Sequence, residues 1–465
     1  MKYALSFFIV GIILLSDRLA TGQNLTSATP EGTVVSSQKR LADTPPMGWN
    51  SWDCLGWTAT EAQVKAAADY MDEHLKHLGY EYIVIDQGWF ADSASSSFEA
   101  FVHDEISSKP TYTLDSFGRL MPDVIKYPSS KNGKGMKPLA DYIHSKGLKF
   151  GLHLLRGIPW ESVEMDMPIK DSDYSASSIG QPTKGCDWYD GFYGVDMTKP
   201  GGQAYYDSVF ELFAEWGVDY VKSDDVINET EFLAISKAAR NCGRDIVLSV
   251  VPANIEWEVL KENCDLARTG HDYWDVWQML KQAFGDANAY TKYRGDGFWP
   301  DLDMLPVGKL GKEISYKGPE ERISNFSEDE LKTLLSLWYI SQSPLMIGGY
   351  LPETDTLTLQ LLTNEEAVAV SKKSVNSRQI KYRNAMVIWV SDIRNSEDKY
   401  LAMFNIWETF KPINMKVAFE QIGINPHKEY VFRDLWSHED IGTYQKEFMA
   451  PVVTHGARLF KVSMK

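Results

Sequence analysis

The sequence predicts an α/β protein, a (β/α)8 TIM barrel followed by a small C-terminal antiparallel β-sandwich domain. Units of helix, glycine and strand recur along residues 60–251, an order that is typical of parallel strands joined by helices. After Ser374 the helical period disappears, and short runs of β-forming residues take its place. The 465 residues, of which 44% are hydrophobic, suffice for one large core and a second domain.

The repeated unit is clearest between residues 60 and 86. Thr60-Glu-Ala-Gln63 is a capping box that opens an Ala-rich helix, Gly79 ends this helix, and residues 80–86 have the composition of a strand. Each such glycine supplies the left-handed residue that closes a helix before the chain returns to the sheet. The same order of helix, glycine and strand recurs in residues 137–154 around Gly147, 203–224 around Gly217, and 231–251 around Gly243.

Weaker strand signals bring the count to eight and place the barrel at residues 45–373. These strands are predicted at residues 47–52, 266–269, 304–307 and 345–347. Two long segments, residues 90–110 and 165–191, follow strands and therefore belong to the face where such barrels carry their active sites. Loops of this length in a compact domain are often functional, and we expect both to shape a cleft.

Residues 1–22 have the features of a signal peptide. An apolar run follows a short positive start and is too short to span a bilayer, and Ala20 and Gly22 offer a cleavage site before Gln23. We expect export, so that the mature protein is secreted or periplasmic and free of the membrane; a retained N-terminal anchor is the alternative. Residues 23–44 are polar and rich in Ser and Thr, and they are expected to form a disordered leader.

Residues 374–465 are predicted to form the all-β domain. Runs at 385–391, 400–406, 415–419 and 459–462 alternate or carry β-formers between turn residues. No paired carboxylates stand out in this part of the sequence. We expect a structural role for the domain, with glycan binding as the alternative.

The formal net charge of −17 restricts the class of ligand. Nucleic acids and anionic membranes require a basic surface that releases counterions, so neither is an expected partner. A neutral ligand is therefore more compatible with this net charge than an anionic one. The sequence does not indicate an oligomeric state.

Cysteine and histidine spacing gives no metal signature. The cysteines lack the C-x-x-C pairs of structural zinc sites and occur singly, as Cys54, Cys186, Cys242 and Cys264. Export permits disulfides, and a bond between Cys242 and Cys264 is predicted. Because His153 and His271 are isolated in the sequence, we expect neither a metal ion nor a cofactor.

The stretch from Gly217 to Val226 places charge inside a predicted strand. The two-residue period puts Lys222 and Asp224 on one face of this strand and Asp225 on the other. A nearby ammonium favours the ionised form of Asp224, which suits a nucleophile or a metal ligand. A solvated strand end with a chance charge pair is the structural alternative.

Carboxylates and indoles gather at the ends of the other predicted strands as well. They are Trp49, Trp52, Asp86, Trp89, Arg268, Asp272, Asp301 and Asp303. Each alone is explained by core packing, a cap or a turn. Together, acids that accept hydrogen bonds from hydroxyls and indoles that cover apolar ring faces are typical of a site for a neutral sugar.

Five motifs in order resemble glycoside hydrolase family 27, the α-galactosidase and α-N-acetylgalactosaminidase family. They are Thr44-Pro-Pro-Met-Gly-Trp-Asn-Ser-Trp52, Ile85-Asp86, Lys222-x-Asp224, Arg268 four before Asp272, and Trp299-x-Asp-x-Asp-Met-Leu305. The resemblance covers residues 45–348. It implies a (β/α)8 barrel with a C-terminal β domain and hydrolysis of terminal α-galactosides, in oligosaccharides or polysaccharides, with retention of configuration.

The resemblance also implies roles for individual residues. Asp224 matches the nucleophile and Asp272 matches the general acid/base of the family. The matching sugar-binding positions are Trp49, Asp86, Lys222, Arg268 and Asp303. The aromatic neighbours of Asp272, among them Tyr273 and Trp274, predict a desolvated setting that suits a protonated acid. No metal ion is needed, because two carboxyls suffice for this chemistry.

This chain departs from the family pattern around the sugar. Gln87 follows Asp86 where many relatives have a second aspartate, and His153 replaces a tyrosine; we expect both to contact substrate, with Trp89 covering the ring. The fifth strand ends Ser249-Val-Val-Pro-Ala-Asn254 without the Cys-Glu-Trp that meets the 2-hydroxyl in relatives, and Val226 replaces a cysteine. The alternatives to an α-galactosidase are a β-L-arabinopyranosidase, an α-N-acetylgalactosaminidase and a non-catalytic carbohydrate-binding protein.

Overall fold

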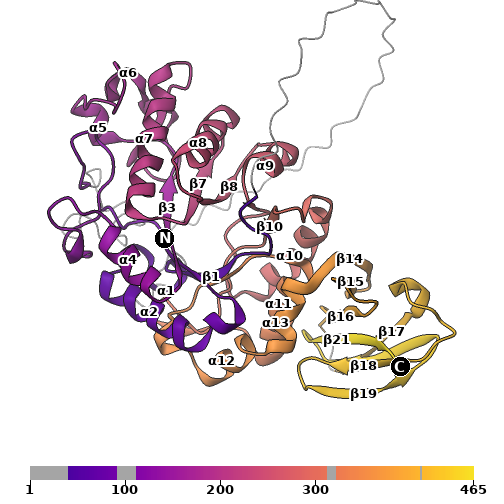
Figure 1. Cartoon of the computed structure of the whole chain (residues 1–465). Coiled ribbons are helices and arrows are strands. Elements are labelled where there is room, and N and C mark those ends of the chain that lie inside the picture. Colours follow the sequence, from indigo (N-terminus) through magenta and orange to yellow (C-terminus); the bar gives the residue numbers. More distant parts are fainter. Residues whose placement is uncertain (1–39, 92–110, 312–320, 409–410) are drawn as a thin grey trace, which may run out of the picture. The chain divides into compact units, whose positions relative to one another are not determined.

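The computed structural model describes residues 40–91, 111–311, 321–408 and 411–465. Within these ranges a curled sheet of parallel strands carries helices around it, and an antiparallel β domain follows (Figure 1). The predicted signal peptide, most of the predicted leader and nearly all of the predicted loop 90–110 lie outside the described residues.

Eight parallel strands form the barrel sheet in the described part of the chain. In chain order they are β1 (Met47–Asn50), β2 (Tyr82–Ile85), β3 (Lys149–Leu155), β7 (Tyr220–Val226), β8 (Val247–Pro252), β9 (Leu266–Arg268), β10 (Trp299–Asp301) and β13 (Leu345–Ile347). Neighbours in the sheet follow the order β10-β9-β8-β7-β3-β2-β1-β13. The barrel closes between β10 and β13 through Leu305, whose N–H donates to the Met346 carbonyl at 2.7 Å.

The structure corrects the predicted seventh strand, which is β10 at Trp299–Asp301 and not residues 304–307. The sequence alone does not favour a strand at these residues, because Pro300 has no N–H to donate to a neighbouring strand. Pro300 is tolerated because β10 pairs in the sheet with β9 alone, through the Trp299 N–H and the Asp301 carbonyl. Asp303, with φ 86°, then turns the chain before Leu305 meets β13.

The longer helices surround the sheet. They are α2 (Glu61–His74), α4 (Lys137–Ser145), α7 (Pro200–Trp216), α8 (Glu229–Asn241), α9 (Trp257–Asn263), α10 (Trp277–Ala289), α11 (Glu328–Ser341), α12 (Thr356–Leu362) and α13 (Glu365–Lys373). The capping box predicted for α2 is confirmed, since the Thr60 side chain accepts from the Gln63 N–H and the Gln63 side chain accepts from the Thr60 N–H.

Helix α7 shows how the sequence returns the chain to the sheet. Pro200 opens it at a position that needs no N–H donor, and Gly217 ends it with φ 83°. Phe210 and Phe213 are buried against the sheet, so the helix is held by its apolar face. This closure sets the start of β7, the strand that carries Lys222 and Asp224.

Short elements lie at the ends of the strands. Between β3 and α7 they are β4 (Ile158–Pro159), α5 (Trp160–Glu164), α6 (Ala176–Ile179), β5 (Gly180–Gln181) and β6 (Phe192–Val195). The others are α1 (Trp52–Leu55), β11 (Lys309–Leu310) and β12 (Arg322–Ile323). The segment 165–191 is therefore structured, with β4 and β5 both paired to β6.

The C-terminal domain is a β-sandwich with its own apolar core. Its strands are β14 (Ser374–Arg383), β15 (Met386–Ile393), β16 (Lys399–Asn405), β17 (Ile413–Ala418), β18 (Tyr430–Asp434), β19 (Glu439–Tyr444), β20 (Glu447–Val452) and β21 (Ala457–Met464). Six of them form one sheet, and β17 pairs with β20. Phe432 stacks on Phe448 with ring centroids 4.0 Å apart in the core between these layers.

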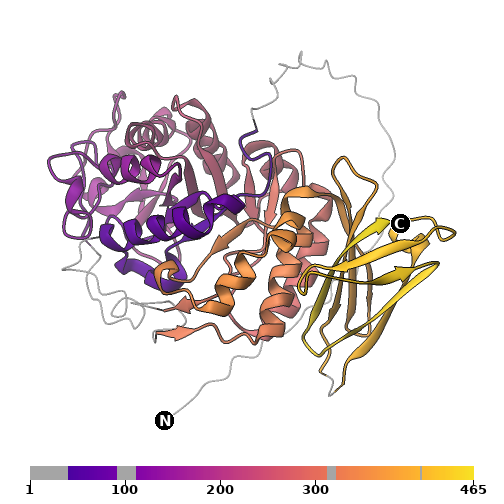
Figure 2. The same cartoon turned by 60° about the horizontal axis from the view of Figure 1, so that its bottom comes forward.

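Helix α11 connects the two domains physically. The Thr333 hydroxyl donates to the His455 carbonyl at 2.6 Å, and the Trp436 indole donates to the Ser336 hydroxyl at 3.0 Å. In Figure 2 the orange helices accordingly lie against the yellow strands. The β domain is thus anchored to the barrel by specific polar contacts as well as by apolar packing.

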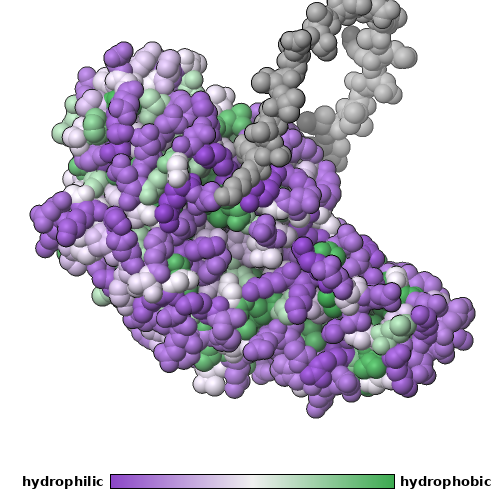
Figure 3. Space-filling view, in the orientation of Figure 1, coloured by the Kyte–Doolittle hydropathy of each residue, from purple (hydrophilic) through white to green (hydrophobic). Residues whose placement is uncertain are grey.

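The structure corrects the predicted disulfide. All four cysteines lie within the described residues and are free thiols. Cys242 donates to the Ala239 carbonyl and Cys264 to the Leu260 carbonyl, so each thiol bonds to its own helix instead of to the other. Among the described helices, none combines the length and the hydrophobicity of a membrane span. The face seen in Figure 3 is mostly hydrophilic, with small separate hydrophobic patches.

Candidate active site

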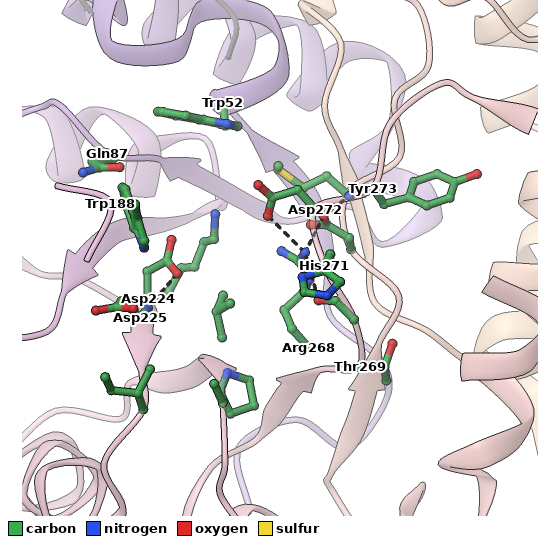
Figure 4. A pocket seen from close by; sticks show the side chains of 18 of the residues that line it. Trp52, Gln87, Trp188, Asp224, Asp225, Arg268, Thr269, His271, Asp272 and Tyr273 are labelled. Carbon is green, nitrogen blue, oxygen red and sulfur yellow. Dashed lines mark hydrogen bonds and ion pairs between the residues drawn. The ribbon is translucent and has the colours of Figure 1, made fainter. Parts of the chain in front are cut away.

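The carboxyl ends of the barrel strands surround a cavity of about 990 Å³ (Figure 4). This volume lies at the upper end of the range for sites that enclose small-molecule ligands. Most of the side chains predicted for the site line this cavity: Asp86, Gln87, Lys222, Asp224, Arg268, Asp272 and Asp303. The structure therefore brings together residues that are far apart in the sequence.

Asp224 lies on the cavity side of β7 with Lys222, as the strand period predicts. The prediction that Asp225 points to the other face is wrong: it also lines the cavity, because its left-handed backbone interrupts the alternation of the strand. The Oδ2 of Asp224 lies 3.2 Å from the His153 Nε2, and its Oδ1 accepts the Asp225 N–H at 2.7 Å. Burial raises the pKa of Asp224, but the hydrogen bond from His153 and the charge of Lys222 outweigh it and hold the pKa well below its usual range. Asp224 is therefore an oriented carboxylate at neutral pH.

Asp86 and Lys222 form a buried ion pair beside Asp224. The Lys222 Nζ lies 2.8 Å from Asp86 Oδ2, which also accepts from the Asn50 side chain at 2.7 Å. Although burial favours the neutral forms, the charge of Lys222 lowers the pKa of Asp86, and the charges of Asp86 and Asp224 raise the pKa of Lys222. Both groups stay charged and offer fixed partners to ligand hydroxyls.

Asp272 faces Asp224 across the cavity, as Figure 4 shows. The Arg268 Nη2 lies 3.3 Å from Asp272 Oδ1 and 2.7 Å from Asp303 Oδ2, and the Tyr273 N–H donates to the same Asp303 oxygen at 2.8 Å. Arg268 and Asp303 are thus fixed by each other, whereas the contact of Arg268 with Asp272 is longer.

The aromatic enclosure predicted for Asp272 is wrong. Its side chain is 56% exposed. Tyr273 and Trp274 are buried, and the ring of Tyr273 points away from the cavity (Figure 4). The acid therefore lies open to the cavity, where it can reach the leaving group of a ligand held against Asp224.

Three residues predicted to bind substrate are not on the cavity wall. Trp49 and Trp89 are buried, and their indole N–H groups donate to the carbonyls of Gly349 and His153. Trp49 belongs to β1 and packs in the barrel core, so at the end of this strand it is Trp52, where α1 begins, that reaches the cavity. His153, which is fully buried, contacts Asp224 and reaches a ligand only through it.

The segment 165–191 shapes the cavity as predicted. It contributes Asp187, Trp188, Tyr189 and Asp190 to the wall. Trp188 is 48% exposed and lies near Gln87 and Asp224 in Figure 4, so its indole is available to an apolar ligand face. Across the cavity, the end of β8 offers Val251 and Pro252 and no carboxylate.

Asp53 is a cavity residue that the sequence interpretation missed. It is fully buried, and within the described part of the chain neither of its carboxyl oxygens has a hydrogen-bond partner. Burial and the charge of Asp303 raise the pKa of Asp53 well above its usual range, against the effect of Lys222. Gly348 makes room for it, because a Cβ there would lie 2.1 Å from Asp53 Oδ2. Its position directly after Trp52 was the only available signal.

We expect Asp53→Asn to raise the free energy of unfolding at neutral pH. A raised carboxyl pKa gives stability that is complete below the unfolded-state pKa of about 4 and is lost as the pH rises through the folded-state value. The amide does not titrate, so the advantage of the variant should grow from about pH 4 upward. Thermal unfolding of both proteins between pH 4 and pH 8 measures this difference. A difference that is constant across this range would contradict the neutral, unpartnered carboxyl.

No three His, Cys, Asp or Glu side chains are grouped as metal ligands in the residues that the structure describes. One ionised carboxylate held by donors faces one accessible carboxyl, and a charged pair lies beside them. Such an arrangement can attack an electrophilic carbon on one side and transfer a proton on the other.

Comparison with known proteins identifies the family. A model described as Alpha galactosidase A matches residues 190–373, and one described as Alpha galactosidase C-terminal beta sandwich domain matches residues 383–462. A family 27 β-L-arabinopyranosidase from Geobacillus stearothermophilus superposes with a TM-score of 0.85 at 41% identity, over 91% of this chain and 97% of that one. The chain belongs to glycoside hydrolase family 27.

Other relatives of this family 27 protein carry different names. A putative α-N-acetylgalactosaminidase from Bacillus halodurans has a TM-score of 0.81 at 37% identity and covers 92% of this chain and 99% of its own. The α-galactosidase of Cyamopsis tetragonoloba is 27% identical over 459 residues, which are 95% of this chain and 92% of the relative. This family 27 protein is thus a glycoside hydrolase, and the sugar must be inferred from its cavity.

Proposed function

We propose that this protein is an exo-acting α-galactosidase, which removes terminal α-D-galactopyranosyl groups from oligosaccharides or polysaccharides, and that residues 1–22 direct its export. The observation that supports the reaction type is the ionised Asp224 opposite the accessible Asp272. A carboxylate that attacks as the nucleophile and an accessible carboxyl that serves as acid and then as base are what a two-step glycoside hydrolysis requires.

The proposed reaction runs by double displacement. The Asp224 carboxylate attacks the anomeric carbon while Asp272 gives its proton to the glycosidic oxygen, and the bond to the leaving group breaks. Asp272, now ionised, takes a proton from water, and the water oxygen attacks the same carbon and releases Asp224. The hydrogen bonds to both oxygens of Asp224 hold it in position for the first step.

Gln87 supports a sugar with polar substituents on this side of the ring. It is buried on the cavity wall, and its Nε2 has no hydrogen-bond partner within the described residues. An unpaired buried donor costs about 1–3 kcal/mol, and a hydroxyl at C4 or C6 of a galactoside would supply the missing acceptor. Trp52 and Trp188 offer aromatic faces for the apolar side of the ring.

A β-L-arabinopyranosidase is the second candidate. The specific observation is the 41% identity with the Geobacillus stearothermophilus enzyme of that name. Its sugar has the galactose ring without the C6 hydroxymethyl group, so the same catalytic carboxyls serve both substrates. Because no second aspartate follows Asp86, hydrogen bonding to a C6 hydroxyl is expected to be weaker here.

Three nitrophenyl glycosides test the proposal. We expect kcat/KM to be highest on the α-D-galactopyranoside, ahead of the β-L-arabinopyranoside and the α-N-acetylgalactosaminide. An advantage of either of the latter above about tenfold, which is some 1.4 kcal/mol in transition-state binding, would overturn the choice of sugar.

The Gln87→Ala variant tests which hydroxyl the Gln87 side chain binds. A loss of kcat/KM on the galactoside alone would indicate the 6-hydroxyl, and an equal loss on the arabinoside would indicate the 4-hydroxyl. No loss on either would remove Gln87 from the sugar site.

A further inference from the structure

Arg156 follows β3 directly and is only 3% exposed. Its guanidinium has five N–H donors in a planar fork, and the structure gives each nitrogen a partner. Nε donates to the Asp225 carbonyl at 2.7 Å, and Nη2 lies 2.9 Å from both Asp225 Oδ2 and the Gly185 carbonyl. Nη1 lies 3.1 Å from the Lys184 carbonyl and 3.5 Å from Glu231 Oε2.

Asp225, which this fork holds at both its carbonyl and its carboxylate, has a strained backbone. Its φ of 54° is in the left-handed region, which side chains other than glycine adopt at a cost of roughly 1–2 kcal/mol. The residue lies where the regular pairing of β7 with β8 is interrupted, between Ser223 and Val226. The ladder with β8 therefore does not constrain Asp225 itself, whereas Arg156 contacts both its carbonyl and its carboxylate.

The conformation matters because Asp225 is joined to the nucleophile. Its N–H donates to Asp224 Oδ1 at 2.7 Å, and the N–H of Arg156 itself donates to the Asp224 carbonyl at 3.2 Å. If Asp225 relaxed to negative φ, the chain on the two sides of its N–Cα bond would have to reorient, which would move the backbone of Asp224 relative to the rest of the cavity. The guanidinium also fixes residues 184 and 185, which lead into the cavity wall at Trp188.

We propose that Arg156 is a positioning residue for catalysis, which holds Asp225 in its left-handed conformation and so keeps Asp224 aligned for attack while it anchors the adjoining cavity wall. The inference rests on the proposed role of Asp224 as the nucleophile. A lysine cannot replace the fork, since its three donors share one nitrogen and cannot span Asp225, Glu231 and two loop carbonyls.

Arg156→Gln and Arg156→Lys test the role, with Arg119→Gln as the matched control. Arg119 is also a buried arginine in an ion pair, 2.7 Å from Asp115, and it lies outside the cavity wall. Misplacing a reacting group by about 1 Å costs on the order of 100-fold, so we expect a kcat loss of that order for Arg156→Gln and a smaller loss for Arg156→Lys. KM should change less than kcat, because Arg156 reaches Trp188 only through residues 184 and 185. Arg119→Gln should lower Tm and leave kcat unchanged.

A second measurement separates alignment from folding. The rate at which a fluorinated, mechanism-based glycoside labels Asp224 reports the attack itself, and it should fall with kcat in Arg156→Gln at temperatures well below Tm. The assay uses whichever nitrophenyl glycoside the wild type hydrolyses, so a wrong choice of sugar does not affect it. Normal labelling by Arg156→Gln, or an equal kcat loss in Arg119→Gln, would overturn the proposal.

A rescue experiment tests the conformational step. Glycine adopts φ near 54° without strain, so Arg156→Gln with Asp225→Gly should recover part of the lost kcat. Arg156→Gln with Asp225→Ala should recover none, because alanine keeps the strain. This second variant also removes the buried carboxylate that has lost its partner. Equal recovery of kcat in both double variants would show that the unpaired charge of Asp225, and not its backbone conformation, causes the loss of kcat. That result would overturn the inference.

Discussion

Asp224→Asn should abolish hydrolysis while the protein stays folded. An amide cannot form the ester to the anomeric carbon, so the first chemical step has no nucleophile. Losses on removal of a nucleophile reach roughly ten-thousand-fold or more in kcat. The measurement is kcat on nitrophenyl α-D-galactopyranoside, with near-UV circular dichroism and Tm to show that the variant folds.

Asp225→Asn is the comparison for this variant, because it changes the neighbouring residue in the same way. The amide keeps the Asp225 backbone and its N–H to Asp224, and it loses only the charge that faces Arg156. We expect a partial loss of kcat for this variant. If it were the inactive one and Asp224→Asn kept near-native turnover, the assignment of the nucleophile on β7 would be wrong.

Asp272→Ala should lose activity in a manner that depends on the leaving group. A general acid contributes about 100- to 10,000-fold, and its contribution is largest for leaving groups that need a proton. We expect losses of this size on melibiose-like disaccharides or alkyl galactosides, and a much smaller loss in the first step on a dinitrophenyl galactoside. Stopped-flow release of the dinitrophenol measures that step directly.

The same variant should accumulate the covalent intermediate. The second step uses Asp272 as a base, so the dinitrophenyl substrate should give a fast burst and a slow steady state. Added azide, which needs no general base, should then raise the steady-state rate. Equal losses on good and poor leaving groups, without a burst, would remove Asp272 from the acid/base role.

Local patterns in the sequence predicted those features that local physics determines. The glycine after α7 and the capping box before α2 depend on a few neighbouring residues, and both are as expected. The period of β7 placed Lys222 and Asp224 on one face for the same reason. The period fails at Asp225, which lines the same cavity because the pairing of β7 with β8 is interrupted there.

Other features depend on contacts that the sequence does not show. Arg156 and Asp225 are 69 residues apart in the chain, and no spacing rule connects them. The choice between Trp49 and Trp52 depends on the residue at which β1 ends and α1 begins, and strand boundaries are poorly defined by propensity. The exposure of Asp272 follows from how the segment after β9 packs, since its aromatic neighbours could have enclosed it.

The closure of the barrel has a consequence for its motions. In the described chain β10 and β13 lie at the two ends of the sheet order, and Leu305 supplies the parallel bridge between them. Segments with few backbone hydrogen bonds open at the lowest free energy, so we expect this seam to open more readily than the other strand pairs of the barrel. Asp303 lies two residues before Leu305, on the cavity wall. Opening of the seam would therefore displace Asp303, and with it one side of the sugar site, without unfolding of the other strands.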